Sequence, residues 1–189
     1  PFCFQSDQSF TTKEFMGIID TEFAMNVIDQ INDNKIRGIT IASRGEPLIC
    51  KDICKILNYI SSKENILEIK LNTNAKRLTQ TLLKDIIKTK VNILVISTDH
   101  YVKEKYEKYR HGAKFENVIN NISRINSIRK SLNREDTLYT RSSGVAVDPD
   151  MNRIKYDHFY QQYLDESATT EVQERWNTYL NNKDQGNLE

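Results

Sequence analysis

The apolar residues of the chain follow two spacings that alternate along its length. Short, nearly continuous apolar runs are typical of parallel strands covered on both faces, whereas apolar residues at every third or fourth position are typical of amphipathic helices. Strands are predicted at residues 36–43, 66–72, 91–96 and 137–147. Helices are predicted around residues 23–31, 53–60, 82–87, 101–109, 115–125 and 172–179, and an aromatic stripe at 156–163 is expected to pack in the core.

This alternation of strand and helix predicts an α/β fold with a parallel sheet. A closed eight-stranded barrel needs roughly 200 residues or more, and this chain of 189 residues shows four such strands. We therefore expect a partial (β/α) TIM-like barrel or an open sheet. Residues 1–147 would form the core, and residues 148–189 would form a helical extension or a bridge towards a further domain.

Charge and cysteine content indicate which partners and which location to expect, but not which reaction the protein catalyses. The formal net charge is +1 and the pI is about 8.1, which gives no support for a nucleic-acid or membrane partner. No apolar run approaches the roughly 20 residues of a membrane-spanning helix. The three cysteines form no secreted disulfide framework, so a reducing cytoplasm is the expected location.

Polar residues follow three of the predicted strands, at the position where parallel α/β proteins place their ligands. Gly45 would let a ligand approach the backbone closely, and Glu46 would supply a carboxylate for an ammonium group. Taken singly, Thr73, Asn74 and Ser97 are also consistent with ordinary loop caps. The three polar segments are residues 44–47, 73–74 and 97–99.

The remaining cysteines and the histidines are expected to be structural or exposed. Cys50 and Cys54 lie four residues apart beside the apolar stripe of a predicted helix, so we expect them to pack as small hydrophobic residues. The spacing of His100, His111 and His158 is not that of metal ligands. His100 follows a predicted strand, where a surface position is favoured over a contact with substrate.

Several segments form an ordered set of motifs: Pro1-Phe2-Cys3, residues 39–47, Leu71-Asn72-Thr73-Asn74, Ile96-Ser97-Thr98-Asp99, and residues 106–122 with Arg110, Phe115, Val118 and Asn121. Together they resemble the radical S-adenosylmethionine (radical SAM) enzymes, which carry a CxxxCxxC motif with an aromatic residue before the last cysteine. The resemblance covers residues 1–147. A shorter and weaker match at residues 174–179 is similar to the bridge that precedes a SPASM domain in one branch of the family.

The resemblance implies a four-iron–four-sulfur cluster that chelates S-adenosylmethionine and cleaves it to a 5′-deoxyadenosyl radical. Cys3 would be the third cluster cysteine, with the first two directly upstream of Pro1, and thiolates are the ligands that suit such a cluster. The radical would take a hydrogen atom from the substrate. The cofactor-binding residues implied are Phe2 at the adenine, Gly45 and Glu46 at the methionyl ammonium, Ser97 and Arg141 at the ribose or carboxylate, and Thr73 and Asn74. Arg141 is equally consistent with a cross-strand ion pair.

The resemblance also implies partners and a longer polypeptide. A flavodoxin or ferredoxin would donate the electron, and the substrate would be a peptide, a carrier-linked molecule or a small metabolite. One motif cysteine cannot hold a cluster, and no cysteine follows Cys54 to hold auxiliary clusters. The chain is therefore expected to be a piece of a longer enzyme, lacking its first strand and its C-terminal part, and to be inactive alone.

Two alternatives stay open at this point. A catalytically inactive α/β ligand-binding module would have kept the pocket and lost the cluster, and the sequence directly before Pro1 would separate it from the enzyme. A cluster-free TIM-like enzyme would instead use Glu46 and Asp99 as an acid–base pair.

Overall fold

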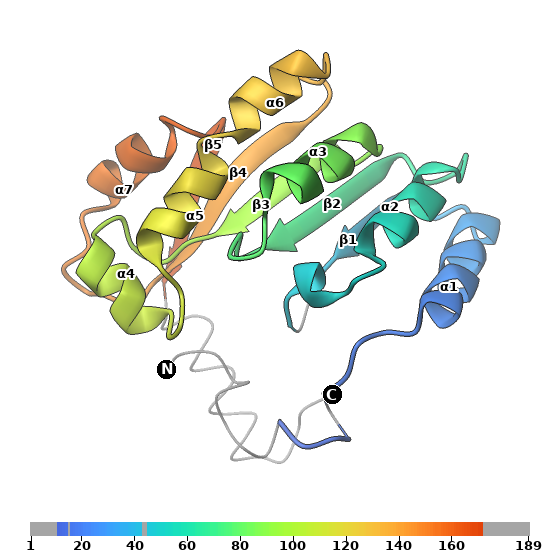
Figure 1. The fold of residues 1–189 in the computed structure, drawn as a ribbon, viewed down its shortest axis with the longest axis horizontal. Helices are drawn as coiled ribbons and strands as arrows, with labels where there is room; N and C mark the ends of the chain where they lie inside the picture. Colours follow the sequence, from blue (N-terminus) through green and yellow to red (C-terminus); the bar gives the residue numbers. More distant parts are fainter. Residues whose placement is uncertain (1–10, 15, 43–44, 172–189) are drawn as a thin grey trace.

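A computed structural model describes residues 11–14, 16–42 and 45–171 of the chain. Within them, five parallel strands form one open sheet, ordered in space as they are in sequence (Figure 1). The strands are β1 Gly38–Ile41, β2 Glu68–Thr73, β3 Ile93–Ser97, β4 Tyr139–Ala146 and β5 Glu166–Glu171.

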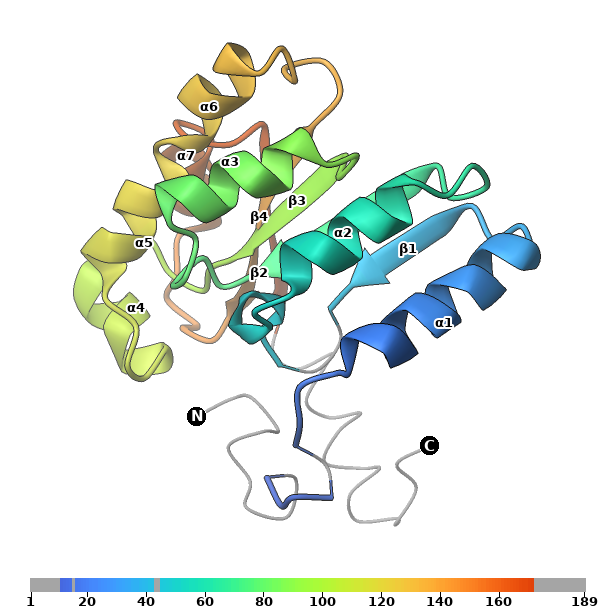
Figure 2. The same cartoon turned by 45° about the vertical axis from the view of Figure 1, so that its right-hand side comes forward.

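The helices that connect the strands lie against one face of this sheet, and the first helix runs beside the edge strand β1 (Figure 2). Side-chain caps help to define where they begin: Asp20 accepts from the Phe23 N–H at 2.9 Å, and Thr79 accepts from the Leu82 N–H at 3.3 Å. The helices are α1 Thr21–Asp33, α2 Ile53–Ser61, α3 Gln80–Lys88, α4 Lys103–Tyr109, α5 Phe115–Ile122, α6 Ile125–Ser131 and α7 Arg153–Tyr160, with a 3-10 turn η3 at Pro47–Ile49.

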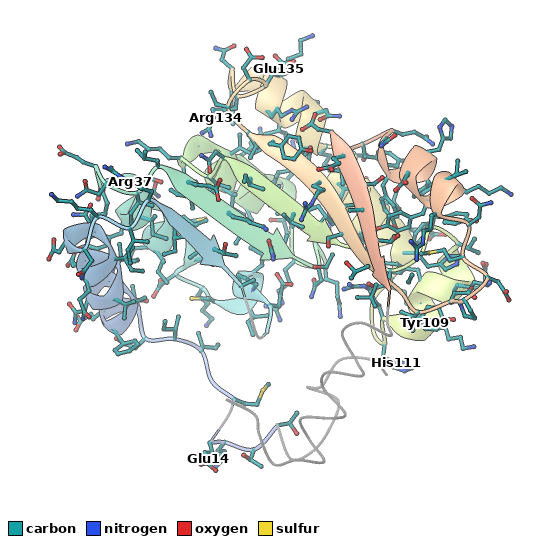
Figure 3. All side chains as sticks on the ribbon, turned by 180° about the vertical axis from the view of Figure 1, so that it is seen from behind. Glu14, Arg37, Tyr109, His111, Arg134 and Glu135 are labelled. Carbon is teal, nitrogen blue, oxygen red and sulfur yellow. The ribbon has the colours of Figure 1, made fainter. Side chains whose placement is uncertain are left out.

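Successive side chains of each strand point to opposite faces of the sheet, and only one of these faces forms the hydrophobic core. On β3, Leu94 and Ile96 are fully buried among the core side chains under the helices. Their neighbours Val95 and Ser97 point to the opposite face, which no helix among the described residues covers (Figure 3). We call this opposite side of the sheet the open face. Polar side chains at the carboxyl ends of the strands therefore project from the open face or from the rim above it.

The predicted α/β class and the incomplete, unclosed parallel sheet are confirmed. Two details of the element prediction are wrong. β1 is a short, partly exposed edge strand rather than a buried one, because within the described residues it pairs only with β2. The predicted helix at 115–125 is two helices, α5 and α6, separated at Ser123 and Arg124.

A fifth strand lies where the sequence shows no strand pattern. Residues 166–171 read Glu-Ser-Ala-Thr-Thr-Glu, yet they pair in parallel with β4 over six registered positions. Ser167 points to the helix-covered side and donates to Asp157 of α7 at 2.6 Å. Residues 148–171 therefore add a helix and a strand to the same sheet, whereas the predicted helix at 172–179 lies outside the described residues. The domain boundary placed at residue 147 stays a prediction.

None of the described helices combines the length and the apolar character that crossing a membrane requires.

Candidate functional site

The first polar turn at the carboxyl rim of the sheet is organised by the carboxylate of Glu46. Oε1 accepts from the Thr73 hydroxyl at 2.5 Å and from the Leu48 N–H at 3.2 Å, and Oε2 accepts from the Asn74 N–H at 2.7 Å. The Thr73 hydroxyl in turn accepts from the Ala75 N–H at 3.0 Å. Glu46, which follows β1, is thereby attached to the end of β2.

A carboxylate offers about four acceptor positions, two on each oxygen. Three described donors occupy both positions of Oε1 and one of Oε2 of Glu46. One acceptor position on Oε2 is left for a ligand. The arrangement suits a further N–H donor such as an ammonium group, held by a carboxylate that the protein has already oriented.

Thr73 and Asn74 act on this carboxylate and on the turn itself. The Thr73 side chain is 2% exposed, and its hydroxyl is used on both sides by the fold. The Asn74 side chain accepts from the Lys76 N–H at 2.9 Å, which closes a local turn. The structure thus brings both residues to Glu46, where they position its carboxylate.

Gly45 lines a cavity of about 430 Å³ beside the edge strand β1. Its φ of +80° is in the left-handed region that favours glycine. The cavity is lined mainly by apolar side chains from α1, β1 and α2 and from residues 17–19 and 47–50, and Glu46 lines it as well. Gly45 and Glu46 therefore line one cavity, and their predicted contact with a shared ligand stays a prediction.

A second, polar cavity of about 150 Å³ lies at the carboxyl ends of β2 to β5. Among the predicted residues it includes Ser97, which is half-buried and whose side chain makes no hydrogen bond to another described residue. The polar groups around it come from four strands and the end of α4. Its polar lining residues are Asn72, Ser97, Asp99, Arg110, Ser143 and Thr170.

A buried ion pair forms one wall of this polar cavity. Asp99 is 1% exposed, and its Oδ2 lies 2.6 Å from Nε of Arg110, whose side chain is 19% exposed. Asp99 Oδ1 accepts from the Val145 N–H at 3.0 Å. The Arg110 guanidinium also lies 5.9 Å from the centre of the Tyr106 ring. The pair therefore connects the ends of β3, β4 and α4.

Electrostatics keep Arg110 and its aromatic neighbour Tyr106 in defined protonation states. Burial is the largest single influence on Arg110 and lowers its pKa, but Asp99, Tyr106 and Tyr160 together outweigh burial, so the pKa is raised above its usual value. Burial raises the pKa of Tyr106 to about 12. Arg110 is thus a permanent cation and Tyr106 a neutral phenol at neutral pH.

Arg141 lies on the open face, in the same row of the sheet as Asn72 and Val95, which line the polar cavity. Its register partners are Val95 on β3 and Glu166 on β5. Its Nε is buried without a hydrogen-bond partner, and so is Oδ1 of Asn72 in the same row of the sheet. Two orphaned polar atoms on one face are consistent with a polar ligand above them.

His100 is buried, so the surface position favoured from the sequence is wrong. It is 2% exposed, and its Nδ1 accepts from the Val102 N–H at 2.9 Å. Its Nε2 lies 3.4 Å from Oδ2 of Asp148, which Lys105 also contacts. Burial lowers the pKa of His100, against the opposing charge of Asp148. The sequence carried no signal for this contact, because Asp148 lies 48 positions further along the chain.

The sulfur-containing candidates divide into two groups. Cys3, together with Phe2, lies outside the described residues, and so their predicted roles stay predictions. Cys50 is buried in the core and Cys54 packs against it, as expected for small hydrophobic side chains. The described residues contain no group of three or more His, Cys, Asp and Glu side chains arranged to hold a metal ion.

The positions of Glu46 and Asp99 bear on the alternative of a cluster-free enzyme that uses these two residues as an acid–base pair. Glu46 lines the apolar cavity and Asp99 the polar one, and each carboxylate is bound by protein donors. This arrangement does not support an acid–base pair formed by the two residues. The sequence identified Asp99 and Arg110 as motif positions, and Asp99 also as part of the acid–base alternative, but it gave no sign of their contact, because 10 residues and a helix separate them.

Comparison with known proteins places this geometry in a family. A sequence profile of the radical SAM superfamily matches residues 1–134. The chain is similar to GTP 3′,8-cyclase from Lactiplantibacillus plantarum, with 27% identity over 123 residues, which is 65% of this chain and 33% of that protein.

Solved structures share the fold. SuiB from Streptococcus suis bound to the precursor peptide SuiA has a TM-score of 0.69 and 16% identity, and the match covers 96% of this chain and 42% of SuiB. SuiB bound to S-adenosylmethionine has a TM-score of 0.68 and 15% identity, with 97% and 42% covered. At these identities the likeness shows the fold alone.

The chain therefore spans about a third of the curated relative and about two fifths of SuiB. The family profile, in contrast, covers well over half of this chain, including β1 to β3 and the Glu46 turn. On that match the chain belongs to the radical SAM superfamily.

Proposed function

We propose that this chain is the core of an enzyme that binds a four-iron–four-sulfur cluster and S-adenosylmethionine. The observation that carries the proposal is the Glu46 carboxylate, which three donors hold at the carboxyl rim with one acceptor position left. An ammonium group is the donor that such a position suits. The family match supports assigning that ammonium to the methionyl end of S-adenosylmethionine.

The other groups fit a nucleoside that extends from Glu46 across the open face. Ser97 would contact the ribose or the carboxylate, and Arg141 would meet the carboxylate with the Nε that has no protein partner among the described residues. Phe2 would pack on the adenine, and Cys3 would supply one thiolate to the cluster. When bound, the cluster and S-adenosylmethionine would supply reductive cleavage to a 5′-deoxyadenosyl radical for hydrogen abstraction.

The chain's own part in this chemistry is to bind, orient and exclude water. Glu46 orients one end of the ligand because its own position is fixed by Thr73 and by two backbone N–H groups. Asp99, whose side chain is 1% exposed, and Arg110 form one wall of the polar cavity, where they would limit the access of water to the ligand.

Substrate and partners are part of the proposal. The name of the curated relative gives GTP as its substrate, and SuiB was solved with a precursor peptide, so relatives act on unlike molecules. A peptide is the first substrate class to test because the structural likeness to SuiB is extensive, and carrier-linked molecules or small metabolites come next. A flavodoxin or ferredoxin would deliver the electron, in the cytoplasm.

The test uses the parent protein expressed from its complete reading frame. The protein is purified without oxygen, supplied with iron and sulfide, reduced, and mixed with S-adenosylmethionine. We expect a bound cluster and release of 5′-deoxyadenosine. Cys3→Ser should abolish both, because a thiolate ligand is lost, whereas Cys54→Ser should retain both, because Cys54 packs in the fold.

Glu46→Gln, made in the same protein, tests whether the Glu46 carboxylate binds the ammonium group of S-adenosylmethionine. The variant should keep its iron and sulfide but bind S-adenosylmethionine about tenfold more weakly or worse, since an amide N–H replaces an acceptor. A correctly folded parent that takes up no cluster would defeat the proposal. If a parent without a cluster still bound S-adenosylmethionine, the result would instead support the catalytically inactive ligand-binding module.

A further inference from the structure

We propose that exposed cations on two neighbouring loops at the carboxyl rim of the sheet form a docking surface for an acidic electron-donor protein. The inference rests on the proposed function and deepens it by naming the surface at which the electron would enter. We call this surface the basic rim. Its cations are Lys76, Arg77, Lys108 and Lys114, with the exposed side chain of His111 among them.

The two loops that carry the basic rim lie side by side. One follows β2, and the other joins α4 to α5. The ammonium nitrogen of Lys76 lies 3.8 Å from the position that a Cβ on Gly112 would take. Asn121 of α5 donates to the Ala75 carbonyl at 2.9 Å, which attaches α5 to the first loop. Figure 3 shows Tyr109 and His111 at the end of the sheet to which the strands point, so the cations of two distant segments form one surface there.

The charge of the basic rim is not balanced by its surroundings. Its Lys and Arg side chains are exposed and form no ion pair with the described residues. The nearby acidic groups are already engaged or lie to one side: Glu116 pairs with Lys103 at 2.5 Å, Glu107 accepts from the Phe115 N–H at 3.1 Å, and Glu104 lies in the first turn of α4. Like charges without counter-charges repel one another, and a negatively charged partner removes that repulsion.

The basic rim begins beside the turn that holds Glu46. The backbone N–H of Asn74 donates to Glu46 Oε2 at 2.7 Å, and the Asn74 side chain accepts from the Lys76 N–H at 2.9 Å. A protein docked on the basic rim is therefore adjacent to the site proposed for the cluster and S-adenosylmethionine. The reduced flavin or iron–sulfur centre of that protein would lose one electron, and the cluster would gain it.

The size and the flanks of the basic rim favour a protein partner over a nucleic acid. Electron-transfer partners form small contacts, which bury less than about 1,200 Å² in total, and a few charges suffice to steer their encounter. Glu104 and Glu116 are exposed beside the basic rim, where they would repel the continuous negative charge of a phosphate backbone.

The experiment measures the binding of two purified acidic donors, a flavodoxin and a bacterial-type ferredoxin, to the parent protein by isothermal titration calorimetry. Arg77→Glu combined with Lys114→Glu should raise the Kd of the donor about tenfold or more at low salt, because attraction becomes repulsion. Raising the salt concentration from about 0.05 M to about 0.5 M should weaken binding to the parent and remove most of this difference. A parent that binds neither donor would overturn the inference.

Lys90→Glu combined with Lys130→Glu is the matched control. Both lysines are exposed and pair with no described side chain, and the two double variants change the net charge by the same amount. Lys90 precedes β3, and Lys130 lies in the last turn of α6, so both are at the amino ends of the strands. The control should change Kd by less than about twofold. Equal losses in the two double variants would overturn the inference, since the net charge alone would then explain them.

Reduction of the cluster separates the docking surface from the proposed function. In stopped-flow measurements the donor should reduce the cluster of the Arg77→Glu, Lys114→Glu variant more slowly than that of the parent. Dithionite, which needs no docking surface, should reduce both to the same extent. A cluster-loaded parent whose donor binding and reduction are unchanged in the variant overturns the docking surface alone, and so does single-stranded RNA binding that the variant loses while donor binding persists. A parent that takes up no cluster defeats the proposed function and this inference together.

Discussion

Single side chains at the rim of this sheet are held by short contacts that tolerate little change. Gly144 on β4 shows this most sharply, because it lies where β3, β4 and α7 meet. Tyr156 of α7 contacts the Thr98 hydroxyl at 2.5 Å and donates to the Thr98 carbonyl at 3.1 Å. The missing side chain of Gly144 leaves the space for this contact.

Replacing Gly144 by Ala should be strongly destabilising. The added Cβ would lie 2.1 Å from the Thr98 carbonyl oxygen and 2.7 Å from the Tyr156 hydroxyl, both far inside contact distance. We expect a loss of about 2 kcal/mol or more in the free energy of unfolding, measured by urea denaturation.

Gly17→Ala is the matched control for this prediction. A Cβ at Gly17 would meet nothing within 4 Å, and its φ is not in the left-handed region. The control should stay within about 0.5 kcal/mol of the parent. A Gly144→Ala variant as stable as the control would show that the rim can rearrange around a methyl group.

At the scale of elements, one arginine connects the turn before β4 to the segment between α3 and β3. Arg134 lies in the turn between α6 and β4 (Figure 3). Its guanidinium donates to the carbonyls of Ile87 at 2.8 Å and Val91 at 2.7 Å, and also to that of Thr89. The last carbonyls of α3 and the approach to β3 are thereby satisfied by a distant residue.

Arg134→Ala should lower the free energy of unfolding by about 2 to 4 kcal/mol, because these carbonyls lose a charged donor. Arg134→Lys should recover only part of that loss, since one ammonium cannot reproduce the planar fork. Urea denaturation of the variants measures both effects. Glu135→Ala, at the next and exposed position, is the control and should change stability by less than about 0.5 kcal/mol.

For the whole molecule, His100 links the protein's stability to pH. Its Nδ1 accepts from the Val102 N–H, so a proton there would require that bond to break. Burial lowers its pKa below 6.5 in the folded protein, although Asp148 opposes the shift. The contribution of neutral His100 to stability is therefore complete above about pH 6.5, the pKa of a histidine in an unfolded chain. It is lost as the pH falls through the lower pKa of His100 in the folded protein.

The free energy of unfolding should accordingly fall between about pH 6.5 and 5 more steeply in the parent than in His100→Asn. Asparagine keeps an acceptor near the Val102 N–H but does not titrate in this range. His158→Asn is the control, because His158 is exposed on α7, and it should retain the parent's slope. Parallel curves for the parent and His100→Asn would contradict this assignment.

The sequence by itself determined most of the sheet. β2 and β3 were predictable because buried parallel strands need apolar side chains on the helix-covered face, which Ile69, Leu71 and Leu94 provide. The position of the polar turns after β1, β2 and β3 was also predictable, because a parallel sheet must place successive strand ends along one edge. The shared position of Gly45 and Glu46 at the carboxyl rim of the sheet therefore follows from the order of residues along the chain.

Only the tertiary structure decided which of these polar groups meet. β5 carries no apolar pattern, and its place in the sheet comes from backbone pairing with β4 and from the contact of Ser167 with Asp157. Asp99 with Arg110, and His100 with Asp148, depend on where a helix end or a later loop returns to the rim. Local side-chain periodicity reports burial, but it carries no information about such contacts between distant segments, because these are set by how whole elements pack.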